Sequence, residues 1–298
     1  MSRAERNPAD RRAPAAAGRL TPDPESVDTP PMPPGPSSAD RDHAYPAHVR
    51  LHRSRAASGV AAAAAAARVI RDAIASRGTA RIMVATGNSQ LAMIDALMAD
   101  ESLAWDRVEA FHMDEYVGLP ATHSASFRLW LNTRVAARRP LRAMHLIEGD
   151  APSAAEEIAR YTTLLSAGPL DLAFVGFGEN GHIAFNDPPV ADFSDPAMLK
   201  VVTLDEACRR QQVGEGHFPH LDAVPRNAIT VTCSGLFRAA AWICCVPEAR
   251  KARAVRDALE GPISTACPAS LVRRHPHATV FLDPDSASLL ARRPPLEA

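Results

Sequence analysis

The stretch of the sequence richest in groups that can do chemistry is GFGENGHIAFNDPP, from Gly176 to Pro189. It holds one histidine, two acids and two asparagines among turn residues, and it directly follows an apolar run. A histidine that is oriented through one ring nitrogen can face a substrate with the other, which is the arrangement of a general acid or base. In this stretch His182 follows Asn180 by two residues and precedes Asp187 by five. The alternative is a structural histidine in a loop, but the neighbouring glycines and acids favour catalysis.

A second polar segment, MDEYVGLP at 113–120, places two adjacent acids at the end of an apolar run. Because side chains alternate along a strand, only one of Asp114 and Glu115 can enter a cleft. A carboxylate there can remove a proton from a carbon next to a carbonyl or imine, provided that its surroundings tune its pKa. A solvated pair or a helix-capping acid is the alternative interpretation of these residues.

The third segment, TGNSQ at 86–90, joins a predicted strand to a predicted helix. Its free backbone N–H groups and the positive end of the helix dipole favour an anion such as phosphate. An ordinary turn with Ser89 as the N-cap of the helix is equally compatible with these residues.

These segments need a scaffold, and the pattern of apolar residues predicts one. Strands are predicted at 80–86, 108–113, 171–177, 228–233, 240–246 and 278–283, and helices at 59–76, 90–100, 126–137, 153–165 and 250–260. Alternating strands and helices predict an α/β fold, with a mainly parallel sheet covered by helices on both faces. In such a sheet a ligand binds at the carboxyl ends of the strands, where the strand order reverses, so the three polar segments should meet there.

Composition excludes several classes of partner. The net charge is −1 without a long basic face, and aromatic residues make up only 5% of the chain, so neither nucleic acid nor a membrane surface is expected as a partner. No apolar run is long enough to span a bilayer. The five cysteines form no CxxC pair, which predicts reduced thiols in a cytoplasmic protein.

Metal binding is not expected from the sequence. The pairs His217/His220 and His275/His277 have spacings that could hold a metal ion, but no cysteine or acid cluster completes either site. We therefore expect all four to be surface histidines.

Residues 1–47 differ in composition from the rest of the chain. They hold ten of the 26 prolines and few large apolar residues, so they cannot bury enough surface to offset the entropy of ordering. The sequence predicts a disordered tail at 1–47 and one domain at 48–298.

Two motifs resemble those of a known family. MDEYVGLP, with GHIAFNDP downstream, is similar to the glucosamine-6-phosphate deaminase (isomerase) family, whose superfamily also contains the 6-phosphogluconolactonases. The resemblance extends from about residue 50 to 290. It implies a Rossmann-like three-layer α/β/α sandwich, a sugar-phosphate substrate and no cofactor. In the family's reaction the sugar ring opens, a proton moves from C2 to C1, and ammonia leaves to give fructose 6-phosphate.

The resemblance also implies roles for particular residues. Asp114 matches the base that moves the proton, His182 matches the acid/base that opens the ring, and Asp187 stands where a glutamate usually supports that histidine. The positions that match the family's phosphate site are Gly87, Asn88, Ser89, Arg209 and Lys251.

The chain also departs from the family pattern. Asn180 replaces an aspartate; its amide oxygen can accept a hydrogen bond from the imidazole but carries no charge. Asp187 is one methylene shorter than glutamate. The phosphate loop reads GNSQ in place of GGTP, and the segment 213–225 is longer than in the deaminases.

Two other functions remain open. A lactonase of the same superfamily would use the histidine to activate water and would need no base at C2, but lactonases typically read DER where this chain reads DEY. A sugar-phosphate sensor without catalysis would not need both Asp114 and His182. Family members are often oligomers, so a homo-oligomer is possible, and the choice between glucosamine and galactosamine stays open.

Removing residues 1–47 should leave the melting temperature and the turnover number essentially unchanged, because a segment that buries little apolar surface contributes little to the domain. Thermal unfolding and steady-state kinetics of the truncated and full chains would check this expectation. A large loss in either quantity would show that the segment docks on the domain.

Overall fold

The structure is a computed structural model that describes residues 48–297. The predicted disordered tail at 1–47 lies outside these residues and stays a prediction.

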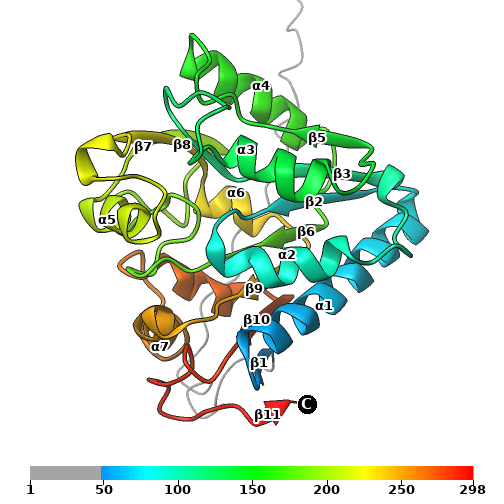
Figure 1. The fold of residues 1–298 in the computed structure, drawn as a ribbon, viewed down its shortest axis with the longest axis vertical. Coiled ribbons are helices and arrows are strands. Elements are labelled where there is room, and N and C mark those ends of the chain that lie inside the picture. Colours follow the sequence, from blue (N-terminus) through cyan, green and yellow to red (C-terminus); the bar gives the residue numbers. More distant parts are fainter. Residues whose placement is uncertain (1–47, 298) are drawn as a thin grey trace, which may run out of the picture. The chain divides into compact units, whose positions relative to one another are not determined.

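A parallel sheet of eight strands is the centre of the fold (Figure 1). Its strands, in the order β11-β1-β10-β9-β6-β2-β3-β5, are Leu296–Glu297, Val49–His52, Ala278–Leu282, Ala241–Cys245, Leu172–Phe174, Ala80–Val84, Val108–His112 and Ala143–His145. Every pair of neighbours in this sheet is parallel. The prediction of an α/β fold with a mainly parallel sheet is confirmed.

The main sheet and the helices form a three-layer α/β/α sandwich. The helices of the described residues are α1 (Arg55–Arg77), α2 (Leu91–Met98), α3 (Phe127–Leu131), α4 (Ala154–Ser166), α5 (Glu206–Gly214), α6 (Cys233–Phe237) and α7 (Ala252–Glu260). The alanine-rich α1 lies along α2 and against β2, β9 and β10 (Figure 1). The Ser54 hydroxyl caps α1 by accepting a bond of 3.2 Å from the N–H of Ala57.

A second sheet was not predicted. It contains β4 (Asp114–Tyr116), β8 (Asn227–Val231) and β7 (Leu199–Thr203), paired antiparallel in that order. The fully buried Tyr116 packs on the rings of Phe127, Phe185 and Phe218, with centroid distances of 5.2–5.4 Å. This aromatic cluster fixes β4, and with it the two acids of the MDEYVGLP segment.

The predicted elements are present with shifted ends. Each of the six predicted strands exists, but β6 ends at Phe174 and β8 at Val231, before the predicted ends at 177 and 233. The predicted helix at 126–137 is α3 followed by a π-helical turn at Asn132–Ala136. Among the described residues, no helix is both long enough and apolar enough to cross a membrane.

Candidate active site

A cleft of about 600 Å³, counting space that opens to solvent, lies at the carboxyl ends of four strands. Its walls come from the segments that follow β2, β3, β6 and β9. The strand order reverses between β2 and β6, since β2 continues to β3 on one side and β6 to β9 on the other. The three polar segments therefore meet where the topology rule predicts. The predicted site residues that line the cleft are Gly87, Asn88, Ser89, Asp114, His182 and Lys251.

Asp114 is the acid that enters the cleft. Its side chain has no hydrogen-bond partner among residues 48–297, although only 6% of the residue is exposed. Burial, with a contribution from the neighbouring Glu115 carboxylate, raises the pKa of Asp114 well above its usual value. A carboxylate that is desolvated and unpaired is a stronger base than one in water, so Asp114 is poised to take a proton.

Glu115 points to the other side of β4, as the alternation of a strand requires. Its carboxylate accepts bonds from the Ser126 hydroxyl at 2.8 Å and the Arg128 N–H at 3.0 Å, and the Arg128 side chain lies 3.5 Å away. Burial raises the pKa of Glu115, and these contacts oppose the rise. Glu115 is thus an anchor for the start of α3 and does not line the cleft.

His182 and Asp187 form a close pair. The Nδ1 atom of His182 lies 2.9 Å from the Asp187 carboxylate. His182 lines the cleft, and 8% of its surface is exposed. Burial acts to raise the pKa of Asp187, but contacts with His182, Asn180 and the Asp205 N–H outweigh burial and hold it below its usual value. Asp187 is therefore an ionised partner that orients the imidazole. Gly178 is required beside it, because a Cβ there would come within 2.3 Å of the ring.

Asn180 does not bond the imidazole, which corrects the expectation from its position. Its amide oxygen accepts from the backbone N–H of His182 at 3.1 Å, and its amide nitrogen donates to Asp187 at 3.0 Å. Asn180 therefore braces the loop and the carboxylate. Of the Asn180 and Asp187 side chains, only that of Asp187 contacts the imidazole.

The predicted phosphate loop also lines the cleft. Gly87 has a φ of +110°, and a 3-10 turn at Asn88–Gln90 leads into α2. Ser89 is not a side-chain cap; its hydroxyl accepts from the Gln90 amide at 3.0 Å. The first N–H groups of this turn have no partner within a helix, so the loop offers donors to an anion.

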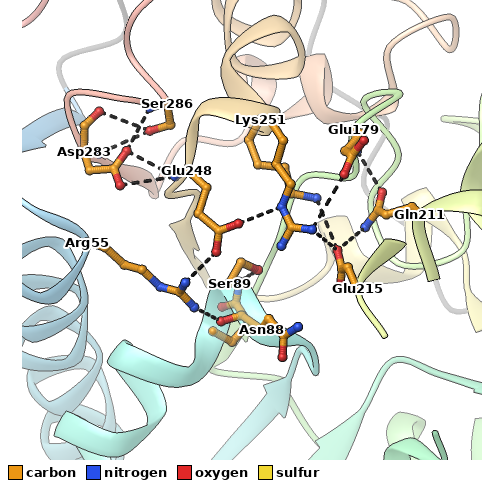
Figure 2. A network of polar contacts seen from close by, with 12 residues as sticks. Arg55, Asn88, Ser89, Glu179, Gln211, Glu215, Glu248, Lys251, Asp283 and Ser286 are labelled. Atoms are coloured by element: carbon orange, nitrogen blue, oxygen red, sulfur yellow. Dashed lines mark hydrogen bonds and ion pairs between the residues drawn. The ribbon is translucent and has the colours of Figure 1, made fainter. Parts of the chain in front are cut away.

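Lys251 faces the same end of the cleft from the segment that follows β9. It is 3% exposed, and burial lowers its pKa although Glu215, at 4.0 Å from Nζ, opposes the effect. Figure 2 shows Ser89, Lys251 and Glu215 around one space, with Arg55 holding the carbonyl of Asn88.

Of the residues predicted for the phosphate site, Arg209 is the one that does not line the cleft. Its guanidinium donates to the carbonyl oxygens of Leu221 and Val224, at 2.6 and 3.1 Å. It therefore ties α5 to the turn that follows it.

Sequence reasoning missed four residues that line the cleft near α5: Gln211, Gln212, Glu215 and His217. Gln211 and Gln212 lie in α5, and Glu215 and His217 lie near the start of the longer segment at 213–225. The signal was present in the polar run QQVGEGH, where glycines flank a single acid.

Among the described residues, one group could ligate a metal: His182, Asp187 and Cys208, whose donor atoms lie within 4.8 Å of one another. These are the proposed acid/base pair and a buried thiol beside it, and all five cysteines are free. His275 is not a surface histidine: it is 6% exposed and stacks on Trp242, with its Nε2 2.9 Å from a carbonyl oxygen.

Comparisons with known proteins identify the family of this chain. The family described as glucosamine-6-phosphate isomerases/6-phosphogluconolactonase matches residues 53–281. The chain belongs to this family. A glucosamine-6-phosphate deaminase of Bacillus cytotoxicus is 34% identical over 222 residues, which cover 74% of this chain and 82% of the relative. A deaminase of Bacillus anthracis is similar to the same extent.

Solved structures of the family share the fold. A monomeric glucosamine-6-phosphate deaminase is 29% identical with a TM-score of 0.74, over 81% of this chain and 99% of that one. The 6-phosphogluconolactonase of Trypanosoma brucei is 16% identical with a TM-score of 0.69, over 83% of this chain and all of the other (100%). At this identity the lactonase shows the fold alone.

Replacing Arg209 with alanine should lower the free energy of unfolding by about 1–3 kcal/mol, because two carbonyl groups lose a charged donor. Arg210→Ala is the matched control; that side chain is 72% exposed and should change stability by less than about 0.5 kcal/mol. Denaturant unfolding and phosphate affinity should be measured together. A loss of phosphate affinity at unchanged stability would instead support the phosphate contact that the family resemblance implies.

Proposed function

We propose that the domain at 48–298 is a glucosamine-6-phosphate deaminase, which converts glucosamine 6-phosphate and water to fructose 6-phosphate and ammonia. The observation that carries the proposal is that Asp114 and His182 line one cleft together with the anion loop and Lys251. The curated deaminases at 34% identity support the same substrate.

Binding begins with the phosphate. The N–H groups and hydroxyl of the loop 87–89, together with the Lys251 ammonium, supply donors at one end of the cleft. Fixing this end holds the sugar so that its reacting carbons lie at the other end, beside Asp114 and His182.

His182 serves the ring-opening step. Its imidazole, oriented by Asp187 at 2.9 Å, gives a proton to the ring oxygen and takes one from the C1 hydroxyl. The ionised Asp187 lies beside Nδ1 and leaves the other ring nitrogen to face the substrate. The product of this step is the open-chain aldehyde.

Asp114 serves the isomerisation. It removes the proton from C2, which leaves an enolamine, and returns a proton to C1. The resulting imine at C2 is hydrolysed, so that water supplies the ketone oxygen and the nitrogen leaves as ammonia. Asp114 needs no metal or redox group for this proton transfer.

Lactone hydrolysis, the alternative reaction, would require different groups in the cleft. Lactone hydrolysis needs a base for water and donors for the oxyanion, and it uses no carboxylate to remove a proton from C2. The unpaired Asp114 favours the deaminase. The expected cytoplasmic location and a possible homo-oligomer stay predictions; the similar deaminase of solved structure is described as monomeric.

Asp114→Asn should reduce ammonia release by about a hundredfold or more, because the amide keeps the shape but cannot act as the base. Exchange of the C2 hydrogen with deuterated solvent should be lost in parallel. Ammonia and fructose 6-phosphate should be followed together, with Asp95→Asn as the control, since that carboxylate is 50% exposed and pairs with Arg138.

The melting temperature of Asp114→Asn should not fall at neutral pH, because the change removes a buried charge. If the parent releases no ammonia but hydrolyses 6-phosphogluconolactone, and Asp114→Asn keeps that hydrolysis, the lactonase takes the place of the deaminase.

The pH dependence of kcat/KM should show an acid limb well above the ordinary aspartate pKa of about 3.9. Burial and Glu115 raise the pKa of Asp114, so the base becomes protonated, and activity falls, as pH is lowered through that raised value. The profile should be measured with unfolding followed at each pH. An acid limb at or below pH 4, with the protein still folded, would contradict Asp114 as the base.

A further inference from the structure

The proposed phosphate end of the cleft contains a carboxylate of the protein itself. Glu215 stands at the C-terminal end of α5 and lines the cleft beside Lys251. Its side chain is 7% exposed, and its Oε1 atom lies 4.0 Å from the Lys251 ammonium. A buried anion at a site for an anionic ligand is unexpected, because like charges repel strongly where water is scarce.

Several donors fix this carboxylate. The Gln211 amide donates to Oε1 at 2.9 Å, Arg250 lies 3.4 Å from the same oxygen, and His217 lies 3.4 Å from Oε2. Burial acts to raise the pKa of Glu215, but His217, Lys251, Arg250 and Gln211 bring it down to about 2. Glu215 is therefore ionised at every pH at which the enzyme would work.

The cations around this end of the cleft already have partners. Arg250 contacts Glu248 at 2.6 Å and Glu179 at 3.8 Å as well as Glu215, and Arg55 contacts Glu248 at 2.6 Å (Figure 2). The positive charge of Arg250 is thus shared among three carboxylates. Of the cations in this network, Lys251 lines the cleft and has Glu215 as its acidic partner.

The orientation of α5 adds to the effect of Glu215. The helix ends at Gly214 with Glu215 as its C-cap, so the negative end of the helix dipole lies at the same place as the carboxylate. A phosphate dianion that reaches Lys251 must lie close to both. The subsite therefore attracts the anion from the loop 87–89 and repels it from α5.

We propose that Glu215 is a specificity-determining residue of the phosphate subsite, whose carboxylate competes with the ligand's phosphate for the Lys251 ammonium. The competition weakens the binding of phosphate by itself, so a ligand is held only when its sugar adds contacts elsewhere in the cleft. Free phosphate and small phosphate esters are thereby kept from filling the site. This inference rests on the proposed phosphate subsite.

The test measures the binding of inorganic phosphate to the full chain by calorimetry. Glu215→Gln keeps the size of the side chain and removes its charge, so phosphate should bind roughly tenfold or more tightly than to the parent. Unphosphorylated fructose, which carries no charge, should bind equally to both proteins. A merely structural role for Glu215 would not improve phosphate binding while leaving the neutral sugar unchanged.

Glu179→Gln is the matched control. It makes the same chemical change at another partner of Arg250, but the Glu179 side chain is 43% exposed and does not line the cleft. Phosphate affinity should change by about twofold or less, because an exposed charge is screened by solvent. An equal gain in Glu179→Gln and Glu215→Gln would show a general effect of net charge and would overturn the proposal.

Lys251→Met separates this inference from the function on which it rests. If that variant loses phosphate binding while Glu215→Gln binds no more tightly than the parent, the subsite is right and the competition is wrong. If Glu215→Gln weakens phosphate binding, Glu215 supports Lys251 and the proposal is overturned. If neither the parent nor Glu215→Gln binds phosphate, the subsite itself is wrong and the inference fails with it.

Discussion

The reversal of strand order between β2 and β6 is the constraint on which the site depends. Because β2 connects toward β3 and β6 connects toward β9, the segments that leave their carboxyl ends turn to opposite sides and leave a space between them. One segment becomes the loop 86–90, and the other becomes the loop that carries His182. The cleft is thus a consequence of topology, and its chemistry depends on which side chains reach it.

The buried carboxylates at the cleft differ in their partners: Asp187 and Glu215 are paired with basic side chains, and Asp114, the proposed base, is not. Asp187 is matched to His182, and Glu215 is matched to Arg250 and Lys251. These contacts lower the pKa of both carboxyls despite burial. Asp114 has no such partner, and its pKa is raised. An unpaired carboxylate in a buried site lowers the stability of the fold. Such groups are found preferentially at functional sites.

The sequence predicted the main sheet and the meeting of the three polar segments because apolar periodicity and strand-end chemistry are local signals. The strand β8 was predicted, but β4 has only three residues and its partners lie far along the chain, so their pairing in a second sheet left no local signal. Arg209 shows the limit for single residues. The family resemblance placed it at the phosphate site, but its guanidinium donates to carbonyl oxygens of the turn that follows α5, and that choice depends on tertiary contacts.

The second sheet joins two parts of the proposed active site. Asp114 begins β4, where Tyr116 packs on Phe185 of the loop that carries His182. The N–H of Phe185 also donates to the Thr230 hydroxyl of β8, the strand that pairs with β4. The proposed base and the proposed ring-opening histidine are therefore held by the same sheet, so a change in β4 that displaces Tyr116 would affect both.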